Sequence, residues 1–190
     1  MLTAVTGGIG SGKSVVSMVL AAMGFRVYDC DREAKRLMDH DARIKDSLCC
    51  EIHPDCVDAD GRINRSRLSE IVFADRTALD RLNFIVHSAV RADLRAWCEK
   101  YGHDRKRLFV ETAILYQSGL DAMVDDVWVV EAPTALRVER VMARNSLSRE
   151  QVLARIEAQD SYVPASCHQC VSLVVNDGCS PVLPQIERLL

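Results

Sequence analysis

A glycine-rich stretch near the amino terminus, Gly7-Gly8-Ile9-Gly10-Ser11-Gly12-Lys13-Ser14, matches the phosphate-binding pattern G-x-x-x-x-G-K-[ST] in full. A loop that wraps a polyphosphate turns its backbone N–H groups inward, and glycine tolerates the required angles and close approach best. In this chemistry the lysine reaches the β- and γ-phosphates, and the serine hydroxyl joins the shell of a Mg²⁺ ion. The residues predicted to bind the nucleotide here are Gly8, Ile9, Gly10, Ser11, Gly12, Lys13, Ser14 and Val15. The alternative is a glycine-rich turn with an accidental Lys-Ser pair.

A nucleotide bound with Mg²⁺ also needs an acid at the end of a neighbouring strand. Glu111 fits this position, because it follows the apolar run Leu108-Phe109-Val110. We expect Glu111 to hold the metal directly or through a water, together with Ser14. Glu131 closes another expected strand and is the weaker competitor. A solvated carboxylate without a function is the alternative for Glu111.

Two aspartates end the second expected strand, in the sequence Asp29-Cys30-Asp31. Because the carboxyl ends of parallel strands share one edge of the sheet, these aspartates are expected to face the γ-phosphate. A carboxylate there can accept a proton from a hydroxyl group during phosphoryl transfer. We predict Asp31 as this base. The alternative for Asp31 is a helix N-cap before Arg32, and the two roles could belong to different aspartates.

Three arginines recur at spacings of three and four: Arg137, Arg140 and Arg144. On a helix this spacing places all three on one face. A charge-dispersed transition state needs cations that approach the phosphates from above, and a lid helix would supply them. We expect at least one of Arg140 and Arg144 to contact the phosphates of the nucleotide. The alternative is that the three arginines form a solvated basic face.

The elements that must position these residues follow from the hydrophobic pattern. Short apolar runs predict five strands, at Leu2–Thr6, Phe25–Asp29, Leu108–Thr112, Asp126–Glu131 and Val171–Asn176. One helix is expected to begin near Lys13 and to end at Gly24, and a second to begin at Pro133. Ser148 and Gln151 form a capping box that predicts the start of a third helix, and Val182–Leu190 is the closing helix. This order of strand, glycine loop, helix and strand predicts an α/β fold of the P-loop type with a parallel sheet.

The middle of the chain, from Asp31 to Lys100, contains no convincing strand and repeats its apolar residues at helical spacing. The sequence therefore predicts three parts. Residues 1–30, 104–135 and 164–190 form the nucleotide-binding core, residues 31–103 form a helical acceptor-binding domain, and residues 136–163 form a lid.

The composition excludes several classes of protein. The chain has 190 residues and a formal net charge of −3, which argues against sequence-independent binding of nucleic acid. No apolar run approaches the roughly 20 residues of a membrane span, and the amino terminus does not resemble a signal peptide, so we expect a cytoplasmic protein without a membrane partner. The eight cysteines are then expected as free thiols, with a zinc site at Cys167-His168-Gln169-Cys170 as the alternative.

The phosphate-binding pattern alone does not separate hydrolysis, switching and kinase activity. The sequence has no convincing Asn-Lys-x-Asp motif for guanine, which argues against a GTP switch. The aspartates after the second strand, the arginine face and the large helical insertion favour a kinase for a small hydroxylic acceptor.

These residues resemble the dephospho-coenzyme A kinase family along nearly the whole chain. The similar positions are Thr6–Ser14, Asp29-Cys30-Asp31, Asp60-Gly61, Arg65, Leu68, Phe73, Leu82-Asn83, His87, Arg140, Arg144, Arg155 with Gln159, and Asn176-Asp177-Gly178. The resemblance implies transfer of the ATP γ-phosphate to the ribose 3′-hydroxyl of dephospho-coenzyme A, with ATP and Mg²⁺ required.

The resemblance also implies roles for single residues. Asp31 would be the base, and Lys13 and Arg140 would stabilise charge on the phosphates. Arg144 would contact the nucleotide. Asn176 and Gly178 would lie near the adenine, and His87 would lie near the acceptor. The alternative for His87 is a satisfied histidine on an amphipathic helix.

The sequence departs from the family pattern at a few positions. Ala113 and Gln117 replace the usual proline and glutamate, Ser88 replaces a proline, and Val15 replaces a threonine. None of these changes touches Lys13, Ser14 or Asp31, so we expect activity to survive, most simply in a monomer. Two other functions remain open: a kinase for another small hydroxyl or nucleoside monophosphate, and a regulatory module that binds ATP without turnover.

Overall fold

The computed structural model describes residues 1–104, 107–145, 147–160 and 168–190. The chain folds into two compact units. The sheet unit comprises Met1–Tyr28 and Tyr101–Leu190, and the helical unit comprises Asp29–Lys100. Among the described residues, no helix has the length and apolar character that crossing a membrane requires.

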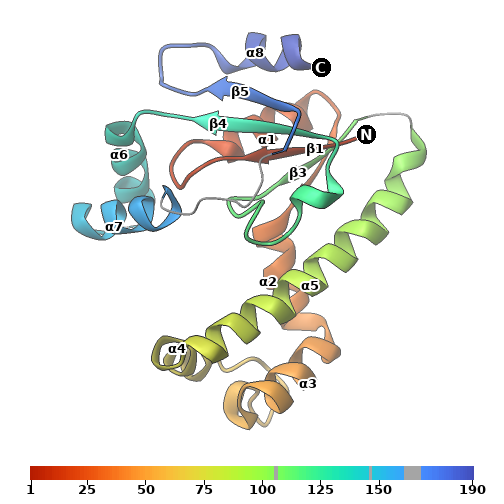
Figure 1. The fold of residues 1–190 in the computed structure, drawn as a ribbon, viewed down its shortest axis with the longest axis vertical. Helices are drawn as coiled ribbons and strands as arrows, with labels where there is room; N and C mark the ends of the chain where they lie inside the picture. Colours follow the sequence, from red (N-terminus) through yellow and green to blue (C-terminus); the bar gives the residue numbers. More distant parts are fainter. Residues whose placement is uncertain (105–106, 146, 161–167) are drawn as a thin grey trace. The chain divides into compact units, whose positions relative to one another are not determined.

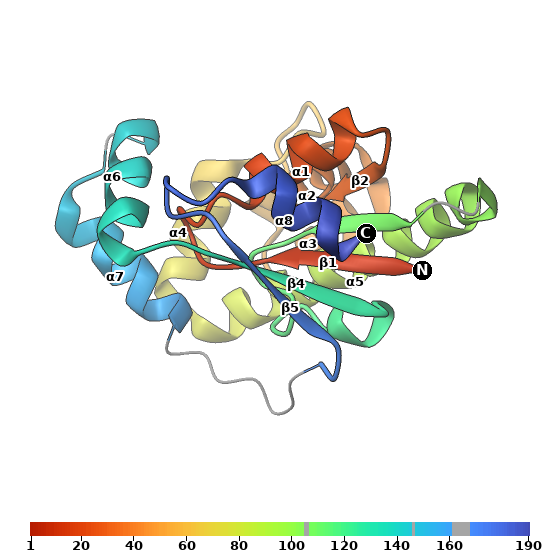
Figure 2. The ribbon, with the colours of Figure 1, turned by 90° about the horizontal axis from the view of Figure 1, so that it is seen from above.

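The sheet unit is built on five strands in the order β2-β3-β1-β4-β5; Figure 1 labels the last four of these and Figure 2 labels β2. Their bounds are β1 Leu2–Thr6, β2 Arg26–Asp29, β3 Leu108–Glu111, β4 Asp126–Glu131 and β5 Val171–Val175. The β1–β3, β1–β4 and β4–β5 pairs are all parallel. Every residue of β1 is buried, as expected for a central strand of a parallel sheet covered on both faces.

Two helices of the sheet unit pack on one face of the sheet (Figure 2). They are α1, Lys13–Ala22, and α8, Val182–Leu189. Their buried side chains, among them Leu20 and Ile186, join Phe109 and Trp128 of the sheet in one core cluster. The ring centroids of Phe109 and Trp128 lie 5.2 Å apart, so side chains from the two strands that flank β1 pack against each other over it.

The other two long helices of this unit form a hairpin: α6, Thr134–Asn145, and α7, Arg149–Asp160. The hairpin has a small core of its own, made of Val138, Val141, Val152 and Ile156. The predicted capping box at its second helix is confirmed: Ser148 N donates to Gln151 Oε1 and Gln151 N donates to Ser148 Oγ. Short 3₁₀ turns at Gly102–Asp104 and Asp121–Met123 complete the unit.

The helical unit is formed by α2 Cys30–His40, α3 Ala42–Glu51, the 3₁₀ turn Pro54–Cys56, α4 Arg65–Ala74 and most of α5 Arg76–Tyr101. Its buried side chains are Cys30, Leu37, Ile44, Leu48, Cys56, Leu68, Ile85, Val90 and Leu94. Within single helices, Ile44 and Leu48 are four residues apart, as are Val90 and Leu94, which places each pair on one buried face of its helix.

The predicted fold class is confirmed, and the strands begin and end within one residue of the predicted positions. Gly24 has φ +86° directly after α1, which is the left-handed geometry predicted for the end of that helix. The division into core, helical domain and lid stays a prediction. The structure itself separates two units, and the α6–α7 hairpin falls within the sheet unit.

Candidate functional site

The phosphate loop, Gly7–Ser14, runs from the end of β1 into the first turn of α1. Gly12 is the N-cap of α1 and supplies no side-chain cap, and the first turn of the helix carries no acidic residue. The first N–H groups of a helix have no partner within the helix and carry the positive end of its dipole. The local structure therefore provides a site for an anion at the amino end of α1.

Asn176 braces this loop from the end of β5. Its Nδ2 donates to Ser11 O over 2.9 Å, its backbone N donates to Glu131 O, and its side chain is buried. A Cβ atom on Gly12 would lie 1.9 Å from Asn176 Nδ2, and Gly12 has φ +96°. Only glycine fits at this position, because both the backbone angle and the contact exclude a side chain.

Substitution of Gly12 by alanine should therefore destabilise the protein more than the same substitution at Gly24. Gly24 has a similar φ of +86°, but a Cβ atom added there would meet no atom within 4 Å. Gly24→Ala should cost about 1–2 kcal/mol from backbone strain alone. Gly12→Ala should cost at least about 1 kcal/mol more, because it breaks a buried hydrogen bond. Denaturant unfolding of both variants measures the difference, and equal losses would contradict the proposed contact.

Two of the predicted cations converge on the phosphate loop. Lys13 Nζ donates to Gly7 O over 2.8 Å and to Gly8 O over 3.2 Å. Arg140 Nη1 lies 3.4 Å from both Gly10 O and Ser11 O, and its Nη2 lies 3.4 Å from Asn176 Oδ1. The loop therefore has a positive charge from α1 and another from α6.

The remaining residues predicted on the nucleotide side lie further out. Arg144 is exposed, and its Nε donates to Asn145 Oδ1. Gly178 is exposed in the turn after β5, where the Asp177 carboxylate accepts from Cys179 N and Ser180 N. These backbone hydrogen bonds lower the pKa of Asp177, and the bond from Ser180 has the largest effect. The roles of Arg144 and Gly178 in binding the nucleotide therefore stay predictions.

Two further contacts to the loop were not predicted from the sequence. Arg137 is 8% exposed, and its Nε donates to Ile9 O over 3.0 Å. Gln159 Oε1 accepts from Ile9 N over 2.7 Å. The sequence places Arg137 on the arginine face and Gln159 among the positions that resemble the family, but neither pattern predicts a contact with Ile9. The available signal for Arg137 was its place on an amphipathic helix, next to the apolar Val138.

A cleft of about 420 Å³ lies beside the loop within the sheet unit. It is lined by Gly7, Gly8, Ser11, Arg137 and residues 129–132 at the end of β4. Ser11 Oγ is buried and has no hydrogen-bond partner among the residues the structure describes. Ser11 and Arg137 thus lie together in the wall of this cleft, next to the phosphate loop.

Ser14 and Glu111 are the residues that could hold Mg²⁺. Ser14 is exposed in the first turn of α1, and Glu111 ends β3 in register with Val5, two residues before the loop. A hydroxyl and a carboxylate are hard oxygen donors of the kind Mg²⁺ prefers, so the two residues fit this ion. Within the described part of the chain, no three His, Cys, Asp or Glu side chains gather into a metal site. Phosphate oxygens and waters would therefore complete the shell.

In the helical unit, the structure separates the roles of the two aspartates after β2. Asp29 is the N-cap of α2: its side chain accepts from Arg32 N over 3.0 Å. The alternative role of Asp31 as the helix cap is therefore wrong, because α2 begins at Cys30 and Asp31 lies inside its first turn. Asp31 is exposed there. Its carboxylate remains available for another function.

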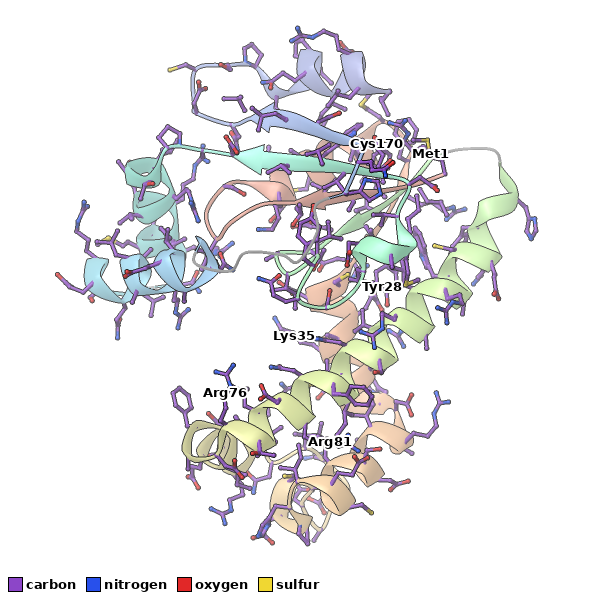
Figure 3. All side chains as sticks on the ribbon, in the orientation of Figure 1. Met1, Tyr28, Lys35, Arg76, Arg81 and Cys170 are labelled. Atoms are coloured by element: carbon purple, nitrogen blue, oxygen red, sulfur yellow. The ribbon has the colours of Figure 1, made fainter. Side chains whose placement is uncertain are left out.

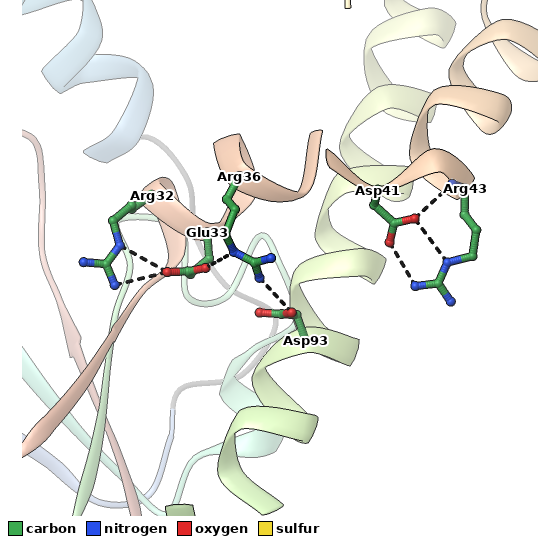
Figure 4. A network of polar contacts seen from close by, with 6 residues as sticks. All are labelled: Arg32, Glu33, Arg36, Asp41, Arg43 and Asp93. Atoms are coloured by element: carbon green, nitrogen blue, oxygen red, sulfur yellow. Dashed lines mark hydrogen bonds and ion pairs between the residues drawn. The ribbon is translucent and has the colours of Figure 1, made fainter. Parts of the chain in front are cut away.

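A network of charged side chains lies along α2 and reaches α5 of the helical unit through one ion pair (Figure 4). Glu33 bridges Arg32 and Arg36, and Arg36 Nη2 donates to Asp93 Oδ1 of α5 over 2.9 Å. The hydrogen bonds to Glu33 and Asp93 raise the pKa of the Arg36 guanidinium. The network begins one residue after Asp31, but its arginines are exposed, so it contributes little to the stability of the helix that carries this aspartate.

His87, the other residue predicted on the acceptor side, lies on α5 and is half-buried. Burial lowers its pKa, and the nearby positive charge of Arg91 lowers it further. His87 is therefore mainly neutral at pH 7, as a donor or acceptor of hydrogen bonds rather than a cation.

His168 and Cys170, from the cysteine and histidine pattern, lie before β5, at the amino ends of the strands, whereas the phosphate loop follows the carboxyl end of β1. Cys170 directly precedes β5, and Met1 directly precedes the parallel strand β1 (Figure 3). His168 Nε2 lies 3.0 Å from Val124 O, and its Nδ1 accepts from Cys170 N. Cys167 lies outside the described residues, and all cysteines within them are free thiols.

Comparison with known proteins gives a consistent result over nearly the whole chain. A family model described as dephospho-CoA kinase matches residues 1–178. A dephospho-CoA kinase from Bacteroides fragilis is 38% identical over 186 residues, which cover 98% of this chain and 89% of that protein. The dephospho-CoA kinase of Porphyromonas gingivalis is 35% identical, with 98% of this chain and 91% of that protein covered.

Solved structures share the fold. A crystal structure of a Thermus thermophilus protein matches with a TM-score of 0.77 and 31% identity, covering 100% of this chain and 93% of that chain. A dephospho-CoA kinase from Campylobacter jejuni matches with a TM-score of 0.70 and 23% identity, covering 99% and 96% of the two chains. The second likeness supports the fold alone.

Proposed function

The chain belongs to the dephospho-CoA kinase family, and on that premise we propose that it transfers the γ-phosphate of ATP to the ribose 3′-hydroxyl of dephospho-coenzyme A, giving coenzyme A and ADP. The observation that supports this most directly is the convergence of Lys13 and Arg140 on a glycine loop at the amino end of α1. Such an arrangement binds a polyphosphate and stabilises the charge that spreads over the transferred group.

On the nucleotide side, the loop N–H groups and Lys13 bind the β- and γ-phosphates. Arg140 donates to the same phosphates and offsets charge as the bond between the γ-phosphorus and the bridging oxygen breaks. Arg144, Asn176 and Gly178 are the residues we assign to the rest of the nucleotide. We assign the α6–α7 hairpin as the lid that keeps out water, which otherwise competes with the acceptor and hydrolyses ATP.

On the acceptor side, we assign the general base to Asp31. The ribose 3′-oxygen attacks the γ-phosphorus, and its proton passes to the Asp31 carboxylate. The assignment is supported by the cap geometry, because Asp29 already bonds the backbone of α2 while Asp31 is exposed. His87 is assigned to binding of the acceptor.

Mg²⁺ would neutralise charge on the β- and γ-phosphates, and Ser14 and Glu111 are the residues that would hold it. Chelation of Mg²⁺ with EDTA should therefore abolish phosphotransfer. Glu111→Gln should raise the Mg²⁺ concentration needed for half-maximal activity several-fold, because an amide binds the ion more weakly than a carboxylate. Glu131→Gln, at the end of β4, is the control. A titration that shifts only in the Glu131 variant would move the metal site to that strand.

A direct assay tests the proposed reaction. Purified protein is incubated with Mg²⁺ and ATP and with dephospho-coenzyme A, nucleoside monophosphates, shikimate or gluconate in parallel. We expect phosphorylation of dephospho-coenzyme A with the highest kcat/KM. Preference for another acceptor would favour a different small-molecule kinase, and equilibrium binding of ATP without transfer to any acceptor would favour a regulatory module.

We further propose that the enzyme works in the cytoplasm as a monomer without a nucleic-acid partner. The formal net charge of −3 argues against sequence-independent binding of nucleic acid, and the cysteines in the described ranges form no disulfide, as expected in a reducing compartment. Size-exclusion chromatography coupled to light scattering tests the oligomeric state.

A further inference from the structure

We propose that Arg137 and Gln159 are positioning residues, which hold the phosphate loop in its nucleotide-binding shape by bonding both backbone groups of Ile9. We call this set of contacts the Ile9 clamp. The proposal rests on the proposed function, since it assigns these residues a part in ATP binding.

The clamp is formed by one residue from each helix of the hairpin. Arg137 of α6 donates its Nε–H to Ile9 O over 3.0 Å, and Gln159 of α7 accepts from Ile9 N over 2.7 Å. Ile9 lies in a turn in the middle of the loop, outside the helices and strands. Backbone groups that are shielded from water need such partners. Because Ile9 N and Ile9 O belong to successive peptide groups, the clamp fixes the orientation of the peptides on both sides of Ile9.

The glycines on either side of Ile9 fit against the same arginine. A Cβ atom on Gly8 would lie 2.1 Å from Arg137 Nη2, and a Cβ atom on Gly10 would lie 2.6 Å from Arg137 O. The guanidinium and the backbone of Arg137 therefore occupy the space that side chains at these two positions would need. The absence of a side chain at Gly8 and Gly10 therefore allows the loop to pack closely against α6, in addition to allowing its backbone to approach phosphate.

Apolar packing supports the same contact. The side chain of Ile9 is half-buried against the hairpin core of Val138, Val141, Val152 and Ile156. The loop thus packs on the hairpin through the Ile9 side chain while its backbone bonds to Arg137 and Gln159. Because Arg140 lies on α6 one turn after Arg137, the clamp also fixes this cation relative to the loop.

Direct measurement of ATP binding tests the clamp without an acceptor. Isothermal titration calorimetry with ATP and Mg²⁺ is carried out on Arg137→Met, Arg137→Lys, Gln159→Ala and the double variant Arg137→Met/Gln159→Ala. We expect each single variant to raise the Kd for ATP at least fivefold. The double variant should raise it by less than the product of the two single effects, because both residues act on Ile9.

Arg137→Lys distinguishes positioning from simple charge. Lysine retains the positive charge but does not place an N–H where Arg137 Nε lies, so its Kd should resemble that of Arg137→Met. Arg188→Met is the matched control, since Arg188 Nε also donates to a backbone carbonyl, that of Pro184, but at an exposed position on α8. Its Kd should equal that of the wild type.

Wild-type binding in both Gln159→Ala and Arg137→Met would overturn the proposal, as would wild-type binding in Arg137→Lys. If Arg137→Met does not fold, Gln159→Ala decides the result, because Gln159 contributes no charge and is only half-buried. A protein that binds ATP but does not phosphorylate dephospho-coenzyme A would contradict the proposed function and leave the clamp to be judged by these Kd values.

Discussion

Replacement of Lys13 by alanine should lower kcat for phosphorylation of dephospho-coenzyme A by roughly 10²–10³-fold, the usual effect of removing one donor that stabilises a transition state. Lys13 Nζ already lies at the loop, within hydrogen-bond distance of Gly7 O and Gly8 O. Its loss removes a positive charge next to the transferred phosphate while the fold stays intact. Steady-state kinetics and thermal melting measure the two effects separately.

Lys45→Ala is the matched control for this prediction. Lys45 Nζ also donates to a glycine carbonyl, that of Gly61, over 2.7 Å, but in the helical unit and at the surface. The control should retain nearly full turnover. Turnover within about threefold of the wild type in Lys13→Ala would remove the phosphate loop from the proposed reaction.

Replacement of Asp31 by asparagine should lower kcat by roughly 10²–10⁴-fold, which is the contribution of a general base. Asparagine has nearly the same shape as aspartate but does not accept the hydroxyl proton. The KM for ATP should change by less than about threefold, because the proposed role of Asp31 concerns the acceptor. Initial rates over a range of ATP and dephospho-coenzyme A concentrations separate kcat from the two KM values.

Asp29→Asn provides the comparison within the same motif. Asp29 caps α2 through Arg32 N, and asparagine is an equally good N-cap. This variant should therefore keep both the helix and most of the activity. If Asp29→Asn loses turnover and Asp31→Asn keeps it, the base is Asp29 and the assignment is reversed.

The contrast between these two aspartates shows where local sequence stops being informative. The sequence allowed either residue to cap the helix, because both precede its polar first turn. The structure shows that Asp29 is the N-cap, because α2 begins at Cys30 and the Asp29 side chain accepts from Arg32 N. A shift of one or two residues in a helix start changes which side chain bonds to the backbone, and sequence patterns rarely define helix ends that closely.

The long-range contacts of the phosphate loop were beyond sequence reasoning for a different reason. Arg137, Gln159 and Asn176 contact the loop across 128, 150 and 165 residues of chain, respectively. No local spacing relates residues so far apart. The place near the adenine that the resemblance implies for Asn176 stays a prediction, and the structure adds a contact that the resemblance does not imply, from its buried side chain to Ser11 O.

The amino-acid sequence by itself determined the loop chemistry and the order of strands and helices, because glycine, lysine and serine spacing and hydrophobic periodicity act within one turn or one strand. Only the tertiary structure decided which side chains support that loop. Hydrogen bonds and packing from β5, α6 and α7 reach it through space, and they depend on how the whole sheet unit folds.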